Sequence, residues 1–356
     1  MPSSVEEKAV TPADSVRIVR EPRLAEKVIV VGGHPGCGKT MMTPIVGSLA
    51  RVEVQKFNYA LEHLCGLNLL GKLDDSSAAA LIRMLCDIDL YNLMMSREAN
   101  FRPSDLSSVF KNPGTWRYLR RLFGPGDAAV LDRIQNEKPI LHMTLHNCLV
   151  ISPPLFSALG TALRILEVIR HPLYMIKQWH LYIERYGTDA REFTLWFEHE
   201  GHSLPFFAYG WEEQYIRSNP MDRVIYSIRH LSVSDEQVLR NLPDSRKKQI
   251  LRIPFERFVL NPWPYLRQLE ALLGTHVTSL THRELKRQRV PRKRIADGIP
   301  LPIYKLNGWA APQRGTDETQ ELGQRRAYAA QFATPEAMKV LDQLSEEYEQ
   351  NFGWWR

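Results

Sequence analysis

A glycine-rich segment that directly follows an apolar run constrains this chain more than any other feature. Residues 28–31 read Val-Ile-Val-Val, and residues 32–40, the glycine loop, read Gly-Gly-His-Pro-Gly-Cys-Gly-Lys-Thr. Gly33, Gly38, Lys39 and Thr40 match G-x-x-x-x-G-K-[ST], between a predicted strand and a predicted helix. Glycines let the backbone turn its N–H groups toward an anion, and the helix adds the positive end of its dipole. The sequence therefore predicts that the glycine loop binds a phosphate-bearing ligand.

The composition excludes several other classes of protein. The 356 residues carry a net charge of +6, which suits an anionic ligand, and they are enough for one large domain. Basic tracts with interleaved aromatic residues are missing, so nucleic acid is not a predicted partner. The first 25 residues hold no apolar signal core, and no apolar run reaches 18 residues, so we predict a cytoplasmic protein without a transmembrane segment. Four cysteines without C-x-x-C spacing favour a reducing compartment and no zinc site: Cys37, Cys65, Cys86 and Cys148.

Strand and helix patterns alternate along the chain. This order predicts an α/β, P-loop-containing fold with a central parallel β-sheet flanked by helices and with large helical insertions. We expect a flexible lead-in over residues 1–24, a single domain over 25–312 and a C-terminal helical extension over 313–356. The predicted strands are 27–31, 54–57, 138–146, 163–170, 223–228 and 248–253, with a short edge strand at 16–19. The predicted helices lie within 59–135 (including 103–110) and at 153–160, 173–186, 190–219, 265–273 and 316–355.

Ligands of such sheets bind at the carboxyl ends of the strands, so the residues that follow each strand are informative. They are His146, Arg170, Arg229 with His230, and Phe255 with Glu256. None of the predicted strands ends in an aspartate that would hold the magnesium of an ATP-dependent enzyme. An arginine at a strand end suggests a second anion site instead. The intact G-x-x-x-x-G-K-T motif still leaves an ATP- and magnesium-dependent kinase open, and a non-catalytic nucleotide-binding regulatory protein is a third alternative.

Three segments carry a resemblance to a known family, in the order that the family has them. Residues 34–40 are the core of the glycine loop. Residues 168–179 place an arginine and a proline before a predicted helix, and residues 250–262 contain Pro-Phe-Glu-Arg-Phe followed by Asn-Pro and a helix. Together, over residues 28–275, they resemble the sulfotransferases that use 3′-phosphoadenosine 5′-phosphosulfate (PAPS). The resemblance implies transfer of a sulfuryl group to a hydroxyl acceptor, with a carbohydrate or glycolipid favoured, and no metal.

The resemblance also implies which residues hold PAPS and its product, 3′,5′-adenosine bisphosphate. The glycine loop would hold the 5′-phosphosulfate, Arg170 the 3′-phosphate, and Lys39 the leaving oxygen. Two departures stand out: Lys39 follows Gly38, whereas the family carries its cation before that glycine, and Gln178 stands where the family has a serine. The complete set of implied cofactor residues is Gly36, Cys37, Gly38, Lys39, Thr40, Met41, Arg170, Gln178, Arg292 and Lys293.

The acceptor hydroxyl needs a general base, and the resemblance implies two alternatives. His146 ends the strand before Arg170, where family members of the cytosolic type place a histidine, and His142 is a lesser candidate. Glu62 lies a short way after the helix of the glycine loop and is the nearest match to the glutamate that the carbohydrate-modifying members have there. An imidazole is suited to proton transfer near neutral pH. Residues 199–202 (His-Glu-Gly-His) do not have the His-Glu-x-x-His spacing, so we predict no metal site there.

Overall fold

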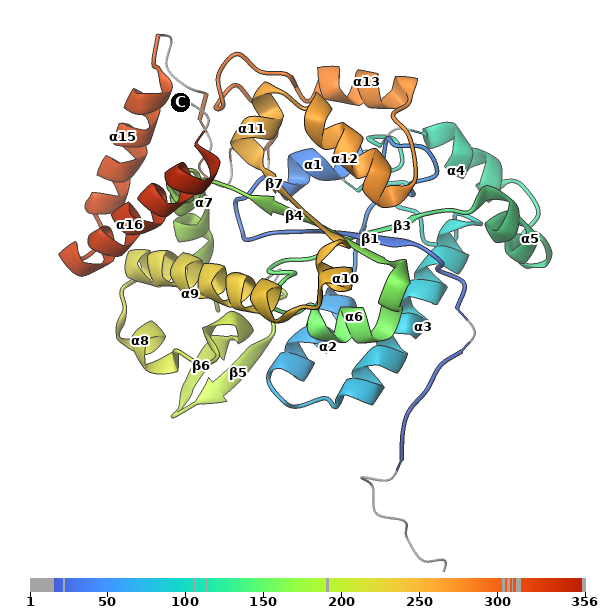
Figure 1. Cartoon of the computed structure of the whole chain (residues 1–356), viewed down its shortest axis with the longest axis horizontal. Coiled ribbons are helices and arrows are strands. Elements are labelled where there is room, and N and C mark those ends of the chain that lie inside the picture. The colour runs from blue at the N-terminus through green and yellow to red at the C-terminus, as the bar shows by residue number, and fades with distance from the viewer. Residues whose placement is uncertain are drawn as a thin grey trace, which may run out of the picture.

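A five-stranded, fully parallel sheet lies at the centre of the computed structural model (Figure 1). Its strand order is β2-β3-β1-β4-β7, which confirms the predicted α/β class. The strand β1 carries the aliphatic side chains of residues 28–31 and is completely buried, as expected for a strand covered on both faces. The structure describes residues 16–353 except 22, 106, 113, 190–191, 303–304, 306–307, 309 and 312–314. The strands are β1 (Val28–Gly32), β2 (Lys56–Phe57), β3 (Leu141–Thr144), β4 (Leu163–Ile169) and β7 (Ile250–Pro254).

Helices cover both faces of this sheet and gather at its carboxyl edge (Figure 1). The glycine loop leaves β1 at that edge and leads into α1. On one face lie α1 (Lys39–Val46), α11 (Phe255–Leu260), α12 (Trp263–Leu273) and α13 (Ser279–Arg287). On the other face lie α2 (Tyr59–Leu69), α3 (Asp75–Leu93), α6 (Pro153–Leu159), α9 (Pro220–Asn241) and α10 (Asp244–Lys247). Near the carboxyl edge lie α7 (Pro172–Ile183), α15 (Glu318–Ala330) and α16 (Pro335–Phe352).

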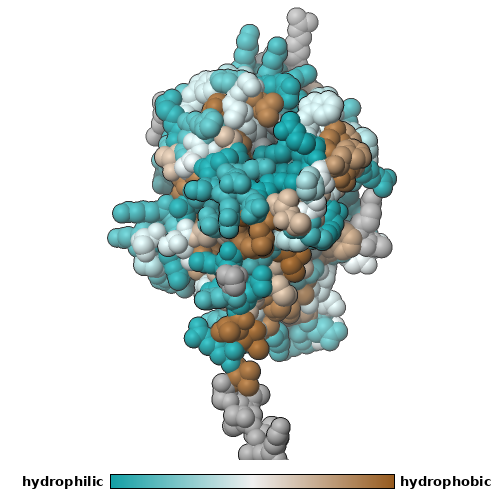
Figure 2. All heavy atoms as spheres, turned by 90° about the vertical axis from the view of Figure 1, so that its right-hand side faces the viewer, coloured by the Kyte–Doolittle hydropathy of each residue, from teal (hydrophilic) through white to brown (hydrophobic). Residues whose placement is uncertain are grey.

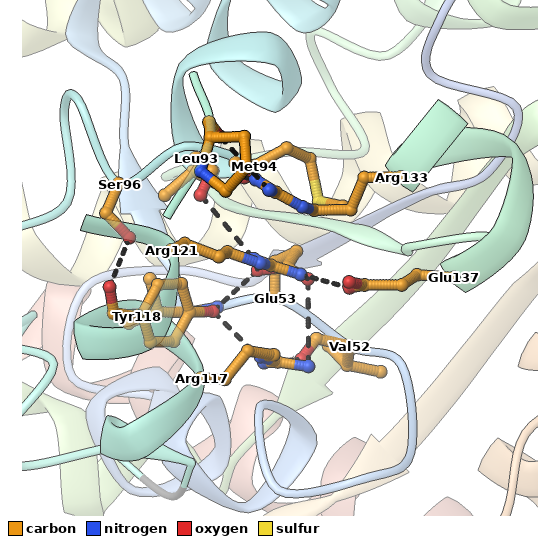
Figure 3. A network of polar contacts seen from close by, with 12 residues as sticks. Val52, Glu53, Leu93, Met94, Ser96, Arg117, Tyr118, Arg121, Arg133 and Glu137 are labelled. Atoms are coloured by element: carbon orange, nitrogen blue, oxygen red, sulfur yellow. Dashed lines mark hydrogen bonds and ion pairs between the residues drawn. The ribbon is translucent and has the colours of Figure 1, made fainter. Parts of the chain in front are cut away.

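A buried ion network fixes α4 (Thr115–Leu122) and α5 (Asp127–Glu137) beside the sheet (Figure 3). The Glu53 carboxylate receives hydrogen bonds from Arg121 Nη1 at 2.8 Å, from Arg121 Nη2 at 3.1 Å and from the Tyr118 hydroxyl at 2.7 Å. Arg117 Nη1 lies 3.7 Å from Glu53 Oε1. Burial alone would raise the pKa of Glu53, but the two guanidinium groups and these hydrogen bonds hold it below its ordinary value. Glu53 is therefore a compensated buried charge.

Two predicted elements near the middle of the chain are wrong. Residues 196–205 form an antiparallel hairpin, β5 (Trp196–His199) and β6 (His202–Pro205), within the stretch predicted as helices; η3 (Phe206–Ala208) and α8 (Glu212–Arg217) follow it. The predicted strand 223–228 lies inside α9. Pro220 stands at the start of α9, and the Asn219 side chain caps it by accepting a hydrogen bond from the Asp222 N–H at 2.9 Å. The apolar run is therefore one buried stripe of a long helix, and Arg229 and His230 do not follow a strand.

Two further segments lack the regular structure that their patterns predict. The described part of residues 103–110 forms turns, because polar side chains compete there for the backbone: Asn100 Oδ1 accepts from the Arg102 N–H at 2.9 Å, and Ser108 Oγ accepts from the Phe110 N–H at 3.2 Å. Residues 16–19 form no strand. The chain beyond them is held by α3, where Asp87 pairs with Arg20 at 2.8 Å. These contacts direct the segment along α3 instead of along the sheet.

Two helices, α15 and α16, form within the C-terminal stretch 316–355 that is predicted as helical. The α15 helix contacts α7, and α16 contacts α7 and α9. The boundary predicted at residues 312 and 313 falls outside the described residues, as do the first 15 residues of the predicted lead-in.

The face at the amino ends of the strands is mainly hydrophilic, with a band of apolar side chains (Figure 2). Exposed apolar residues of the elements on this side include Met84 and Ile88 of α3 and Leu131 of α5. Scattered apolar residues are ordinary on protein surfaces. Among the described helices, none combines the length and the apolar character needed to cross a membrane.

Candidate active site

The glycine loop has a backbone that residues other than glycine rarely adopt at three of its positions. Gly33, Gly36 and Gly38 have φ values of 134°, 82° and 106°. A Cβ on Gly33 would collide with the Val168 carbonyl oxygen, and one on Gly38 would collide with the Phe255 ring. The loop can approach its neighbours this closely only because both positions are glycine. Phe255 thus sets the position of the loop from the side of β7.

Lys39 turns its ammonium group back into the glycine loop. Its Nζ donates to the carbonyl oxygens of Gly33 and, at 3.1 Å, of His34, and it lies 3.8 Å from Cys37 Sγ. Among the described residues, no side chain accepts a hydrogen bond from the first N–H groups of α1, which begins after Gly38. Burial raises the pKa of the Cys37 thiol, which favours its neutral form. The loop therefore combines a buried cation with a helix N-terminus, and these features fit a bound phosphate.

His34 fastens the glycine loop to two other elements. Its Nδ1 lies 3.1 Å from Asn147 Oδ1, and its Nε2 lies 3.1 Å from Asp235 Oδ2 of α9. Burial alone would lower the pKa of His34, but the Asp235 carboxylate raises it above its ordinary value. Burial, with a contribution from Asp235, also raises the pKa of Glu167, the β4 residue level with Gly32. A cavity of about 170 Å³ adjoins this cluster and is lined by Cys37, Asp235 and other residues.

The two alternative bases, His146 and Glu62, lie in direct contact. Glu62 Oε2 accepts a hydrogen bond from the His146 backbone N–H at 2.8 Å and lies 3.2 Å from His146 Nδ1. The His146 side chain is 36% exposed, whereas that of Glu62 is 9% exposed. Burial alone would raise the pKa of Glu62, but His146 and Lys39 lower it below its ordinary value. Glu62 is therefore an ionised, buried partner that holds Nδ1 of the ring, and Nε2 is the ring nitrogen left to exchange a proton.

Aromatic rings stand beside this pair on the side of the hairpin. Tyr59, one turn before Glu62 in α2, packs against Phe193 with ring centroids 5.1 Å apart. The two residues are 42% and 52% exposed. His63 Nε2 lies 2.7 Å from the Phe193 carbonyl oxygen, which joins α2 to the segment before β5. Exposed aromatic faces next to a candidate base are suited to stacking on an acceptor.

Arg170 lies on the other side of the glycine loop from β3. Its Nη1 donates to the Gly36 carbonyl oxygen at 2.8 Å, and its Nε lies 3.8 Å from Glu256 Oε1. The guanidinium carbon is 4.2 Å from the centroid of the Phe255 ring and 5.1 Å from that of Tyr174. Burial lowers the pKa of Arg170 and raises that of Glu256. Two rings and a carboxylate thus hold a buried cation beside the loop.

Arg292 approaches the same aromatic ring as Arg170. Its guanidinium carbon lies 5.5 Å from the Phe255 centroid. The adjacent Lys293 is exposed. The described contacts place Tyr174 of α7, not Gln178, against Arg170. Of the residues implied for the second anion, Arg170 and Arg292 therefore both contact the Phe255 ring.

His142, the lesser base candidate, and the His-Glu-Gly-His segment do not belong to this arrangement. His142 is fully buried within β3, and burial lowers its pKa to about 4. It belongs to the core and cannot exchange a proton with an acceptor at the surface. His199 and Glu200 lie at the turn of the β5–β6 hairpin, close to Glu213 of α8. These three residues are half-buried or exposed. Exposed groups of this kind are common without a bound ion.

Several contacting residues were not predicted. Tyr174 lies within residues 168–179. It is four residues after Arg170, and α7 begins between the two, so this spacing was the available signal for their contact. Asp235 and Tyr348 lie far from the motifs in the sequence, and no local pattern marks them. Tertiary packing alone brings them to His34 and to Glu256.

Comparisons with known proteins give structural similarity without sequence similarity. No family model and no curated protein matches the sequence. The sulfotransferase domain from the curacin biosynthetic pathway is 12% identical, with a TM-score of 0.44, over 90% of this chain and 97% of that one. The sulfotransferase domain from the Synechococcus PCC 7002 olefin synthase is 14% identical, with a TM-score of 0.41, over 90% and 94%. Mouse sulfotransferase SULT7A1 complexed with PAP is 11% identical, with a TM-score of 0.35, over 94% and 87%. At these values the comparison assigns no activity, which must be argued from the site.

Proposed function

We propose that this protein is a PAPS-dependent sulfotransferase that transfers a sulfuryl group to a hydroxyl acceptor, with a carbohydrate or glycolipid favoured. The observation that carries the proposal is that two contacting base candidates lie on one side of the glycine loop, while two arginines that both contact the Phe255 ring lie on the other. One end of this arrangement suits an acceptor hydroxyl, and the other suits a second anionic group. A donor with phosphates at both the 5′ and 3′ positions matches this division.

The residues fit such a donor. The glycine loop and Lys39 would hold the 5′-phosphosulfate, and Arg170 with Arg292 would hold the 3′-phosphate, because arginine binds phosphate through two donors at once. When bound, PAPS supplies the activated sulfuryl group. Lys39 would stabilise the negative charge that develops on the leaving phosphate oxygen. The loop amides would contribute in the same way.

His146 and Glu62 would share the work at the acceptor. The His146 Nε2 would accept the proton that the acceptor hydroxyl releases, and bound PAPS would supply the sulfuryl group that this oxygen receives. The ionised Glu62 holds Nδ1 and stabilises the imidazolium that forms. The exposed rings of Tyr59 and Phe193 would stack on the acceptor, which favours a sugar. The two alternative bases of the sequence thus become one pair with different roles.

The kinase alternative loses support at the carboxylates that lie beside the loop. Its magnesium ion needs an available carboxylate. The raised pKa of Glu167 favours its neutral form, and Asp235 is ion-paired with His34. A magnesium ion at this place would therefore compete with His34 for Asp235 and would have to displace the proton of Glu167.

A transfer assay tests the proposal. The wild-type protein is incubated with PAPS carrying radioactive sulfur and with a panel of glycans and glycolipids, in the presence of EDTA. Label in at least one acceptor is the expected result. Binding of the bisphosphate without labelling of any acceptor would favour the non-catalytic nucleotide-binding protein instead.

A further inference from the structure

The C-terminal helices form part of the surroundings of Arg170. From α16, the Tyr348 hydroxyl donates to Glu256 Oε2 at 2.5 Å, and the other oxygen of Glu256 lies 3.8 Å from Arg170 Nε. From α15, Glu318 Oε2 accepts the hydroxyl hydrogen of Tyr174 at 2.7 Å. Tyr174 is the ring that stacks against Arg170. The extension therefore reaches the second anion subsite from two directions.

The two oxygens of Glu318 bond to two different segments. While Oε2 holds Tyr174 of α7, Oε1 accepts the Ile295 backbone N–H at 2.7 Å. Ile295 is fully buried, and its carbonyl oxygen accepts a hydrogen bond from Arg292 Nη1 at 2.8 Å. One carboxylate thus connects the side chain that stacks on Arg170 with the segment that carries Arg292.

The charge of Glu318 is accommodated by its own neighbours. It is the first residue of α15, where the helix dipole favours an anion, and both of its oxygens are engaged by donors. Its hydrogen bond and charge raise the pKa of the Tyr174 hydroxyl, with burial as the largest cause, so Tyr174 remains a donor. Glu318 acts on Arg170 and Arg292 through these neighbours.

We propose that Glu318 is a positioning residue that holds Arg170 and Arg292 at the spacing required by the 3′-phosphate of a bisphosphate nucleotide. The inference rests on the proposed function, because it assigns the second anion to the donor's 3′-phosphate. It gives the C-terminal extension an indirect effect on selection of the donor, through Tyr174 and the segment of Arg292. Loss of Glu318 would leave the glycine loop and its 5′-phosphate contacts in place.

The test compares two ligands that differ only in the 3′-phosphate. Calorimetry measures the Kd of 3′,5′-adenosine bisphosphate and of adenosine 5′-monophosphate for the wild type and for Glu318→Ala. We expect the Kd of the bisphosphate to rise about tenfold, which corresponds to about 1.4 kcal/mol, and that of the monophosphate to change less than about twofold. Glu336→Ala, which removes the same charge from an exposed position of α16, is the matched control and should change neither Kd.

Two milder variants keep the test valid if Glu318→Ala does not fold. Tyr174→Phe removes the hydrogen bond from the Tyr174 hydroxyl to Glu318, and Glu318→Gln keeps one acceptor oxygen at this position. Both variants should raise the bisphosphate Kd by less than Glu318→Ala does. A purely structural role predicts equal losses for both nucleotides, and that result, or an unchanged bisphosphate Kd, would overturn the inference. Failure of the wild type to bind the bisphosphate would refute the proposed function instead.

Discussion

His146 and Glu62 show how one contact changes the assignment of a residue. Each is a plausible base by itself, but the 2.8 Å bond from the His146 N–H and the approach of Nδ1 make Glu62 the partner of the ring. A buried, ionised carboxylate next to a partly exposed imidazole is suited to orientation and charge stabilisation. The roles follow from the difference in burial.

Replacement of His146 by alanine removes the proposed base. We expect kcat to fall by about 10²- to 10⁴-fold, the usual contribution of general-base catalysis, while bisphosphate binding is unchanged. Glu62→Gln should also lower kcat, because an amide can present a donor where the ring needs an acceptor. Transfer of labelled sulfate and calorimetry measure the two effects separately. Full turnover by His146→Ala would assign the base to another group.

Replacement of Arg170 by alanine removes a charged donor from the second anion subsite. We expect bisphosphate binding to weaken by about 1.5–3 kcal/mol, typical of hydrogen bonds to charged groups, and binding of adenosine 5′-phosphosulfate to weaken less. Equal losses for the two ligands would contradict a role at the 3′-phosphate. Arg240→Ala, at an exposed position near the end of α9, serves as the control.

The residues of the site were predictable where a local pattern carries the chemistry. The glycine loop is such a case, because its turns require glycine and its cation, Lys39, is the first residue of the helix that follows. Arg170 was also predictable from its place at a strand end. Asp235 was not, because a residue in the middle of a long helix has no local signal for its contact with His34.

At the scale of elements, the same limits explain the errors. The run at 223–228 satisfies the local pattern of a strand, but the cap at Asn219 and the proline after it begin a 22-residue helix. The β5–β6 hairpin has an antiparallel register that depends on pairing between Trp196 and Pro205, which no periodicity reveals. By contrast, the helix predicted at 265–273 is confirmed, with Gly274 at its C-terminus in the left-handed conformation.

The junction between the glycine loop and α1 is sensitive to a single methyl group. Gly38→Ala would put a Cβ into the Phe255 ring at a φ of 106°, so we expect a loss of about 1–3 kcal/mol in the free energy of unfolding and weaker nucleotide binding. Gly323→Ala is the control in α15, where no atom lies within 4 Å of the added Cβ. There the free energy of unfolding should rise by about 0.4–1 kcal/mol. Denaturant titration measures both, and a neutral Gly38→Ala would contradict the close approach of the loop to Phe255.

At the scale of the whole molecule, the network around Glu53 joins α4 and α5 to the sheet (Figure 3). Removal of one partner of a buried ion pair leaves the other charge uncompensated. We expect Glu53→Ala to lower the free energy of unfolding by about 3–5 kcal/mol. Asp342→Ala, which breaks an exposed pair with Arg326, should cost less than about 1 kcal/mol. Similar losses for the two variants would show that the buried network contributes little.

The same network gives a dependence of stability on pH. The folded pKa of Glu53 lies below its ordinary value of 4.5, so its stabilising contribution is present above about pH 4.5 and is lost as the pH falls through the folded pKa. Glu53→Gln, which does not titrate, should therefore show a shallower loss of stability between pH 5 and pH 3 than the wild type. Urea titrations at several pH values measure this difference. Parallel curves would mean that Glu53 does not control the acid limb.

The division of the site into a 5′ end at the glycine loop and a 3′ end at Arg170 is the central claim, and a ligand-dependent shift in Tm tests it most directly. Without magnesium, 3′,5′-adenosine bisphosphate at 100 times its Kd should stabilise the protein by about 2.7 kcal/mol. Adenosine 5′-monophosphate at the same concentration should stabilise it less. We expect this order without any metal. Stabilisation by ATP with magnesium, and none by the bisphosphate, would contradict it and favour the kinase.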